Sequence, residues 1–417
     1  MKTTSFCFAV LFCALVGVLS ARAEVLDRPQ GVRIGERLTL RPYVSLTATY
    51  DSNVNARGSR AGSDEDDDFY WSISPGLGLT YNAENWSLLM SGYYTYRHYF
   101  KEANKDLNRH TFGEEIRYNW ANSTGNEKGW SLILGESFQR IARTDDLTMN
   151  DGRGYTSDSQ QFQITGAVMR RFNEYWHGDI NGGYYQLDYD NDTNERYSYY
   201  GWSRWLVGAE AGFAPSKWTD ILLSGSYQGY TQDNTSLSTI GDNSTGLTLQ
   251  GGLGSYMTDR ISYRALAGWS QFDYGDGASK ANGFVYTLSG NWKIGETWNM
   301  MLLGSSYYQP SERQYSSQTR VDSLSWGVAK SMVRGKLRGT FDIRYRHETI
   351  EHVTNSSYDY ALDIWTGRIG LDYSLCRFLS VFGYGEYQKS MNDESDRRNG
   401  AYDYDRWRIS LGLKLSY

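Results

Sequence analysis

The chain has 417 residues, an aromatic content of 15% and a formal net charge of −6. This acidic balance gives no support for nucleic-acid binding, which depends on basic surfaces. Cysteine is scarce: Cys7 and Cys13 lie near the amino terminus and Cys376 near the carboxyl terminus. A small secreted scaffold held together by disulfides is therefore excluded.

The first 23 residues have the pattern of a secretory signal peptide. Lys2 is followed by an apolar run over residues 6–19 and by Ala21-Arg22-Ala23, a small-x-small cleavage site. The apolar run is too short to span a membrane comfortably. We expect three parts: a cleaved signal peptide at 1–23, a periplasmic tail (or a plug) at 24–37, and a membrane domain at 38–417.

A repeat with a spacing of about 40 residues organises the rest of the chain. Short polar turns, most of them followed by Trp, alternate with longer loops rich in Asp, Asn, Ser and Gly, the first at 51–68. The short turns lie at 82–86, 125–130, 173–176, 215–218, 258–260, 295–298, 333–336 and 376–377. Propeller blades can have such a period, but they hold four short strands each, and every interval here holds only two long runs.

The runs between turns predict an all-β fold, a transmembrane antiparallel up-and-down β-barrel of about eighteen strands (16–18). An even number places both chain ends on the periplasmic side. The expected strands start near Leu38, Phe69, Trp86, Arg109, Gly129, Ser157, Trp176, Tyr197, Trp218, Asn243, Arg260, Asn282, Trp298, Gln318, Arg334, Ser357, Arg377 and Tyr402.

Alternation within the runs predicts a water-filled lumen. In the last run apolar residues take every second position, with Arg406, Arg408 and Lys414 between them. Burying such a face in a dry core would cost several kcal/mol for each unpaired charge, whereas a wet lumen avoids that cost. The lumen-lining candidates for solute selectivity are Arg97, Arg117, Arg204, Arg264, Arg338, Asp342, Arg344, Arg346, Arg368, Arg406, Arg408 and Lys414.

Two interpretations of these charges stay open. Basic residues concentrate in the runs that start near Arg334, Ser357 and Tyr402, which could form a stripe that favours anionic solutes or an acidic glycan. Alternatively, acids balance the arginines, which then serve only solvation and pairing. Tyr93 and Tyr99 are candidate lumen aromatics that could stack on sugar rings.

Aromatic residues mark two further features of a membrane barrel. Trp residues just after the short turns predict a girdle at the inner membrane interface: Trp86, Trp130, Trp176, Trp218 and Trp298. The chain also ends in an alternating strand with a terminal aromatic residue, which looks like the signal read by barrel assembly machinery. Its residues are Trp407, Ile409, Leu411, Leu413, Leu415 and Tyr417.

The first hairpin resembles a family of outer-membrane β-barrel porins associated with exopolysaccharide gene clusters. The resemblance is carried by RPYVS at 41–45, YDSNV at 50–54 and SISPGLGLTY at 72–81. It implies an outer-membrane barrel and a channel through which a secreted polysaccharide leaves, working with periplasmic export proteins. It implies no catalytic residues.

Other functions remain as alternatives: a general diffusion porin for small polar solutes, a plugged barrel for surface adhesion, or a soluble propeller or lectin. His347 and His352 lie near Glu348 and Glu351, but their spacing does not match a helical zinc signature. We expect no catalysis, no metal and no cofactor. The expected partners are outer-membrane lipid and lipopolysaccharide, the assembly machinery, and by resemblance polysaccharide-export proteins and a polysaccharide.

Overall fold

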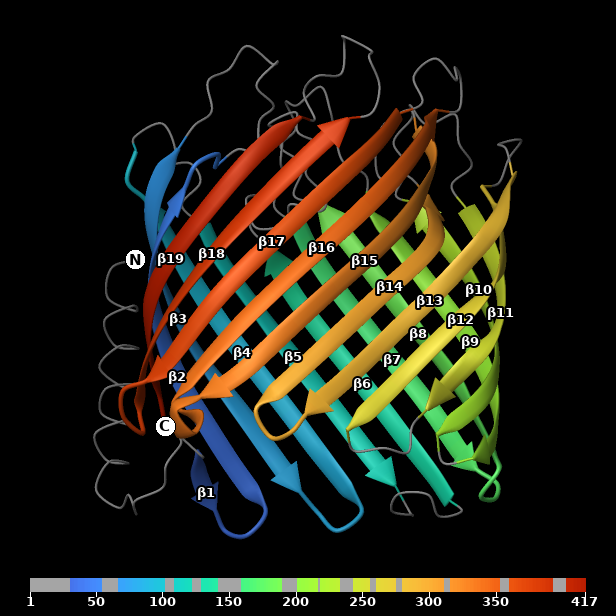
Figure 1. Ribbon diagram of the computed structural model, residues 1–417, viewed down its shortest axis with the longest axis horizontal. Coiled ribbons are helices and arrows are strands. Elements are labelled where there is room, and N and C mark those ends of the chain that lie inside the picture. The colour runs from blue at the N-terminus through green and yellow to red at the C-terminus, as the bar shows by residue number, and fades with distance from the viewer. Residues whose placement is uncertain are drawn as a thin grey trace.

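The strands form one antiparallel sheet that closes into a barrel (Figure 1). This computed structural model describes residues 31–54, 67–101, 109–121, 129–141, 159–189, 201–216, 218–232, 243–255, 260–274, 280–310, 316–352, 360–392 and 403–417. The described sheet has 19 strands, and the ring consists of the 18 that remain without the short β1 (Val32–Ile34). The predicted fold class and strand number are confirmed.

The ring strands are 13 to 17 residues long, long enough to cross a bilayer at a tilt. They are β2 (Leu38–Asp51), β3 (Asp68–Asn82), β4 (Trp86–Tyr99), β5 (Arg109–Ala121), β6 (Gly129–Ile141), β7 (Ser159–Arg171), β8 (Trp176–Tyr189), β9 (Trp202–Ser216), β10 (Thr219–Gln232), β11 (Asn243–Ser255), β12 (Ile261–Asp273), β13 (Lys280–Ile294), β14 (Trp298–Pro310), β15 (Ser316–Met332), β16 (Leu337–His352), β17 (Tyr360–Ser374), β18 (Leu379–Asn392) and β19 (Tyr404–Ser416). A short 3-10 turn, η4 (Val333–Gly335), joins β15 to β16.

Each strand pairs with the next along the chain, and the last pairs with the first. The closing ladder runs from Arg408 opposite Asp51 to Ser416 opposite Tyr43. Pairing of all neighbours removes the open edges that a sheet in lipid cannot leave exposed. We call the two ends of the barrel the turn end, at the bottom of Figure 1, and the loop end, at its top.

The described part of the predicted tail is ordered as a small hairpin. Residues 32–34 pair with Leu38–Leu40 through a turn in which Gly35 has a φ of 67°, a conformation that favours glycine. The signal peptide and the rest of the tail, residues 1–30, lie outside the described residues, so their prediction stays a prediction.

The first long loop is shorter than the sequence suggested. Its expected limits, Asp51 and Asp68, are the last residue of β2 and the first of β3, and they pair with each other. Both carboxylates lie on the inward face, with Asp51 opposite Arg408 of β19, so their polar character reflects the lumen wall and not a loop.

Apolar side chains cover the outside of the wall. Leu411, Ile369 and Leu223 expose 61–66% of their surface, which is unusual for large aliphatic residues in water-soluble proteins. The alternation predicted for β19 is present: Trp407, Ile409 and Leu411 are exposed. Arg406 and Ser410, which alternate with them along the strand, are buried. The described residues contain no helix that is long and apolar enough to cross a membrane.

Glycines on the inner face allow a sharp bend at β11 and β12. A Cβ added to Gly252 would lie 2.0 Å from the Ala265 carbonyl oxygen, and one added to Gly268 would lie 1.9 Å from the Leu249 oxygen. The bend brings β9 close to β12, so that Arg264 forms an ion pair with Glu210 across two intervening strands.

The bend makes one substitution diagnostic. We expect Gly268→Ala to lower the free energy of unfolding by about 1–3 kcal/mol, because the added methyl group overlaps backbone that must move. Gly367→Ala is the matched control, since nothing lies within 4 Å of a Cβ added there. Urea unfolding of the refolded variants in lipid vesicles measures the difference. Equal stabilities would contradict the bend.

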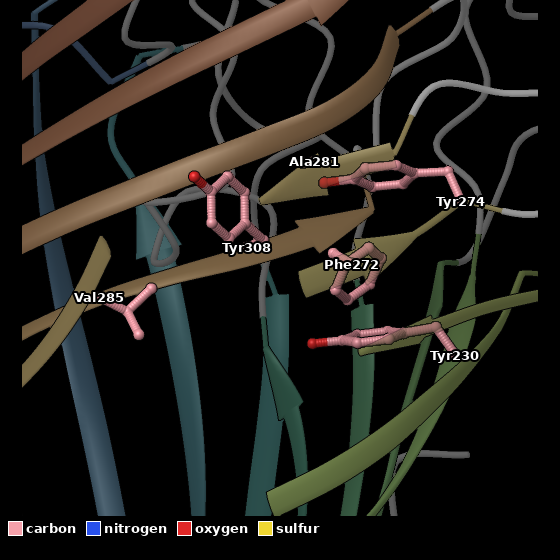
Figure 2. Packing of buried hydrophobic residues seen from close by; sticks show 6 residues of the cluster. All are labelled: Tyr230, Phe272, Tyr274, Ala281, Val285 and Tyr308. Carbon is pink, nitrogen blue, oxygen red and sulfur yellow. The ribbon is translucent and has the colours of Figure 1, made fainter. Parts of the chain in front are cut away.

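The wall overlaps itself at the loop end of β13 and β14. Their ladder stops at Thr287 opposite Ser305, although both strands continue. Tyr308 shares the outward face of β14 with Leu302, yet it is only 8% exposed and packs with Phe272 and Val285 of the inner face (Figure 2). The loop end of β14 therefore lies inside β13, and one of the buried apolar clusters, which includes Tyr308, Phe272 and Val285, fills this overlap.

Candidate functional site

The inner face of the barrel is the candidate functional site, because it is the polar face of a closed wall. Strand pairing and alternation put all twelve candidate residues of the sequence analysis on this face. They do not form one group. Eight lie on β16, β17 and β19, which follow one another around the ring with only β18 between β17 and β19.

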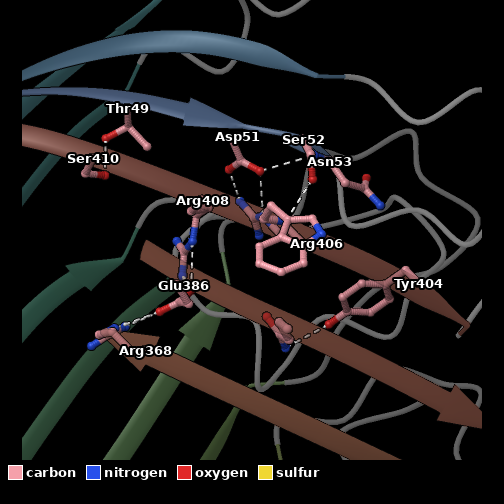
Figure 3. Close-up of polar contacts among 12 residues, drawn as sticks. Thr49, Asp51, Ser52, Asn53, Arg368, Glu386, Tyr404, Arg406, Arg408 and Ser410 are labelled. Atoms are coloured by element: carbon pink, nitrogen blue, oxygen red, sulfur yellow. Dashed lines mark hydrogen bonds and ion pairs between the residues drawn. The ribbon is translucent and has the colours of Figure 1, made fainter. Parts of the chain in front are cut away.

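A carboxylate at the centre of this basic wall joins two arginines. Glu386 of β18 is 3% exposed, and its Oε2 accepts a hydrogen bond from Arg368 Nε at 2.9 Å. Its Oε1 accepts one from Arg408 Nε at 2.8 Å. The three side chains are drawn in Figure 3. Two cations thus share one anion, which leaves a local excess of positive charge.

A second buried pair lies where the ring closes. Arg406 of β19 and Asp51 of β2 are 2% and 0% exposed, and Arg406 Nε donates to Asp51 Oδ1 at 2.8 Å. Asp51 also accepts the Asn53 backbone N–H at 3.2 Å. Toward the turn end from this pair, the Thr49 and Ser410 hydroxyls lie 2.7 Å apart across the same seam (Figure 3). The first and last strands are therefore fastened by polar contacts inside the lumen.

The remaining charges of this wall divide along its height. Arg346 pairs with Glu348 near the loop end. Within the described part of the chain, Arg338, Arg344 and Lys414 form no ion pair, and Lys414 lies 4.9 Å from the centre of the Tyr43 ring. Each of the two interpretations from the sequence therefore describes one part of this wall. Acids balance the arginines toward the loop end, and an excess of basic residues lies toward the turn end.

The turn end of the basic wall opens into a cavity of about 620 Å³. Lys293, Lys336 and Arg338 line it together with Glu296 and Asp372. Since bases outnumber acids among these charged residues, this mouth of the lumen carries a net positive charge.

The loop end of the lumen is closely packed. Lumen-facing side chains at this end are almost fully buried on several walls: Tyr99, Leu187, Phe272, Val321, Ile350, Leu362 and Tyr404. These side chains contact other protein atoms instead of an open channel. The lumen wall thus carries unpaired charged side chains toward the turn end and closely packed, buried side chains at the loop end.

The other four candidates lie apart from the basic wall. Arg97 lies 4.7 Å from the centre of the Tyr70 ring, Arg204 lies over the Tyr185 ring, and Arg264 pairs with Glu210. Arg117 is exposed on β5. Tyr93 and Tyr99 also face inward, where Tyr93 fills the space left by Gly113.

Three acids that organise the wall were absent from the predicted site. Glu386 and Glu348 are in phase with inward residues of their own strands, so alternation could have found them. Asp51 was assigned to a loop. Each becomes recognisable only when the partner on the next strand is known, and the sequence does not give that register directly.

The histidine group of the sequence analysis is divided between the two faces. His347 faces outward, where its Nδ1 lies 2.8 Å from Asp363 Oδ1, while Glu348 faces the lumen. Among the described residues, no group of three or more His, Cys, Asp or Glu side chains could hold a metal ion.

An ion pair lies at the rim of the loop end, outside the strands. Lys101 hydrogen-bonds Asp67, which holds the pKa of that carboxyl below its usual value. Both side chains are about half exposed, so the contact contributes little to stability.

The five predicted girdle residues lie on the outside at the turn end. Trp86, Trp130, Trp176, Trp218 and Trp298 expose 36–64% of their surface. Neighbouring cations lie over two of them, with Arg170 at 4.6 Å from Trp130 and Lys330 at 4.3 Å from Trp298. Their position at a membrane interface stays a prediction.

The predicted assembly signal forms the outward face of β19. Trp407, Ile409, Leu411, Leu413 and Leu415 are all about half exposed or more. Tyr417 stacks on Phe378 with ring centres 5.3 Å apart and donates its backbone N–H to Pro42. Recognition by assembly machinery remains untested.

No protein-family model and no curated protein matches the chain. Among solved structures, it is similar to the outer membrane protein OpdK of Pseudomonas aeruginosa, with 13% identity, a TM-score of 0.43, and coverage of 91% of this chain and 99% of that one. It is also similar to the siderophore receptor PirA of Acinetobacter baumannii, with 9% identity, a TM-score of 0.44, and coverage of 95% and 81%. It is similar as well to the FrpB iron transporter of Neisseria meningitidis, with 8% identity, a TM-score of 0.44, and coverage of 92% of this chain and 82% of that one. Likenesses this distant carry no argument about function, and the fold assignment rests on the strand pairing of this chain.

Proposed function

We propose that the protein is a channel of the bacterial outer membrane that passes polar solutes and favours anions. One observation carries the proposal: a closed ring of 18 strands has an apolar outside and a charged inside. Closed barrels with this arrangement are the β-structures that lipid tolerates, and rings of this size leave room for water. Outer-membrane lipid, lipopolysaccharide and the barrel assembly machinery are its proposed partners.

The preference for anions follows from the basic wall. Arg338, Arg344 and Lys414 have no ion-pair partner among the described residues, and Glu386 neutralises only one of its two arginines. An anion that crosses the lumen therefore meets a net positive surface, which is how charged walls select ions in wide pores.

The solute that we propose is an acidic exopolysaccharide, delivered by periplasmic export proteins. Its support is the resemblance of the first hairpin to exopolysaccharide-associated porins, together with a basic mouth at the end where such a polymer would enter. A general diffusion porin for small anions is the first alternative. The close packing at the loop end favours a second alternative, a barrel whose lumen stays shut while the protein acts as an adhesion or binding protein.

Planar-bilayer recordings test the proposed function. The purified full chain should produce stepwise conductance. In a KCl gradient, the reversal potential should shift toward the equilibrium potential of chloride. Acidic oligosaccharides added at the turn end should block the current in a length-dependent way, whereas neutral ones of equal length should block less. Absence of steps would favour the shut barrel, and a potassium preference would contradict the anion proposal.

A further inference from the structure

A small cavity of about 250 Å³ lies against the lumen wall formed by β6 to β9. Gln163, Tyr185 and Arg204 form an inward row at this cavity, since Tyr185 is paired with both of the others. The cavity is on the lumen side, because Arg204 lines it while its outward neighbour Trp205 does not. The space exists beside Gly183, which is two residues from Tyr185 on the inward face and adds no side chain.

The charge of this cavity comes from one arginine. Among the described residues, Arg204 is the only charged one that lines it, and it forms no ion pair with any of them. Its guanidinium lies 5.6 Å from the centre of the Tyr185 ring and 5.7 Å from that of Tyr230, and its Nη1 donates a hydrogen bond to the Tyr230 hydroxyl at 3.3 Å. The inward acids of β8 and β9, Asp179 and Glu210, lie six residues further toward the turn end, roughly 20 Å away at about 3.4 Å per residue. The positive charge is therefore not neutralised locally.

The other lining groups are neutral and of two kinds. Gln163 has an amide that forms no hydrogen bond with the described residues, and Thr165 and Asn181 add a hydroxyl and a second amide. Such groups both donate and accept hydrogen bonds, as sugar hydroxyls do. Ile133 and Leu206 add apolar surface. Pockets for drug-sized ligands measure about 300–1,000 Å³, so this smaller cavity suits a single ring that carries hydroxyl groups and a negative charge.

We propose that this cavity is a binding subsite for one carboxylate-bearing sugar ring, a uronic-acid unit of the transported glycan. Arg204 receives the carboxylate, because a guanidinium matches a carboxylate with two parallel hydrogen bonds. The Gln163 amide hydrogen-bonds the ring hydroxyls, and Leu206 contacts the C–H face of the ring. The inference deepens the proposed function and rests on it, since that function brings the glycan into the lumen.

The cavity lies across the lumen from the basic wall. β9 is nine strands from β18 in either direction around the 18-strand ring, and β18 carries Glu386 between Arg368 and Arg408. The basic wall presents charge, which acts on any anion, whereas the cavity adds hydrogen-bonding groups that distinguish a sugar from other anions. We therefore expect the cavity, rather than the basic wall, to determine which anionic rings are bound.

Titration calorimetry of the purified full chain in detergent tests the subsite with three one-ring probes. Galacturonate has the carboxylate and the hydroxyls, galactose lacks the carboxylate, and cyclohexanecarboxylate lacks the hydroxyls. We expect each of the last two to bind at least about tenfold more weakly than galacturonate. Equal affinity for galacturonate and cyclohexanecarboxylate would show a site for carboxylates in general and would overturn the sugar assignment.

Two substitutions assign the roles of the cavity side chains. Arg204→Gln should weaken galacturonate binding at least about tenfold and leave galactose binding unchanged. Gln163→Leu should weaken galacturonate and galactose alike, at least about threefold, and spare cyclohexanecarboxylate. Arg41→Gln is the matched control and should bind galacturonate like the wild type, because Arg41 is an exposed inward cation on β2 that also hydrogen-bonds a neutral partner, the Thr80 hydroxyl. Heat-modifiable gel migration shows that each variant is folded.

Bilayer recordings of the same wild-type preparation separate this inference from the channel proposal. Conductance without a preference for galacturonate would overturn the subsite and leave the channel. Galacturonate binding without conductance would support the subsite and contradict the channel. The subsite is also wrong if Arg204→Gln and Arg41→Gln lower the galacturonate affinity equally.

Discussion

Asp51→Asn lowers the free energy of unfolding by about 3–5 kcal/mol, because it leaves the buried Arg406 guanidinium without its counter-charge. Both side chains are at most 2% exposed, so water cannot replace the lost carboxylate. The ion pair fastens the first strand of the ring to the last, and the substitution should therefore also slow closure of the barrel. Urea titration of refolded protein in lipid vesicles measures the stability.

Two controls separate the buried pair from a general effect of losing lumen charge. Asp342→Asn removes a lumen carboxylate that is partly exposed and should change stability by about 0.5 kcal/mol or less. The double variant Asp51→Asn/Arg406→Gln removes both charges and should recover a large part of the loss. If the free energy of unfolding of Asp51→Asn stays within about 1 kcal/mol of the wild-type value, the Asp51–Arg406 ion pair does not stabilise the closure of the barrel as the geometry indicates.

Reversing the unpaired cations of the basic wall should invert the ion preference. The triple variant Arg338→Glu/Arg344→Glu/Lys414→Glu changes the lumen charge by two units at each position. A unit charge about 4 Å from a permeating ion is worth about 1 kcal/mol in water. We therefore expect the chloride-to-potassium permeability ratio to fall at least about tenfold, measured from reversal potentials in a KCl gradient.

A substitution in the same network should act in the opposite direction. Glu386→Gln removes the anion shared by Arg368 and Arg408, so the preference for chloride should increase although the barrel becomes less stable. Both effects should shrink at high salt, because mobile ions screen the wall charges. Reversal potentials that do not respond to either change would show that ions do not pass along this wall.

The barrel itself could be predicted from the sequence because the alternation that produces it is visible within each single strand. A strand that meets lipid on one side and water on the other must alternate, and β19 shows this from Trp407 to Leu415. Trp residues after short turns marked where strands begin, and β4, β8 and β14 start at Trp86, Trp176 and Trp298 as expected. Alternation likewise gave the inward face of the basic wall.

Features that depend on the curvature of the closed ring could not be predicted. The Glu210–Arg264 pair spans two strands because of the bend at Gly252 and Gly268, and no spacing in the sequence encodes it. The overlap that buries Tyr308 arises because the β13–β14 ladder ends early.

Cysteine accessibility along one strand of the intact protein in vesicles tests the central claim that this wall separates lipid from water. With Cys376→Ser as background, single cysteines replace residues 340–344 of β16 one at a time. The structure predicts that cysteines at positions 340, 342 and 344 react with a water-soluble maleimide. Cysteines at positions 341 and 343 should resist it, and a fluorophore attached to them before reconstitution should be quenched by a lipid-phase quencher. Equal reactivity at all five positions would contradict a barrel that holds water inside and hydrocarbon outside.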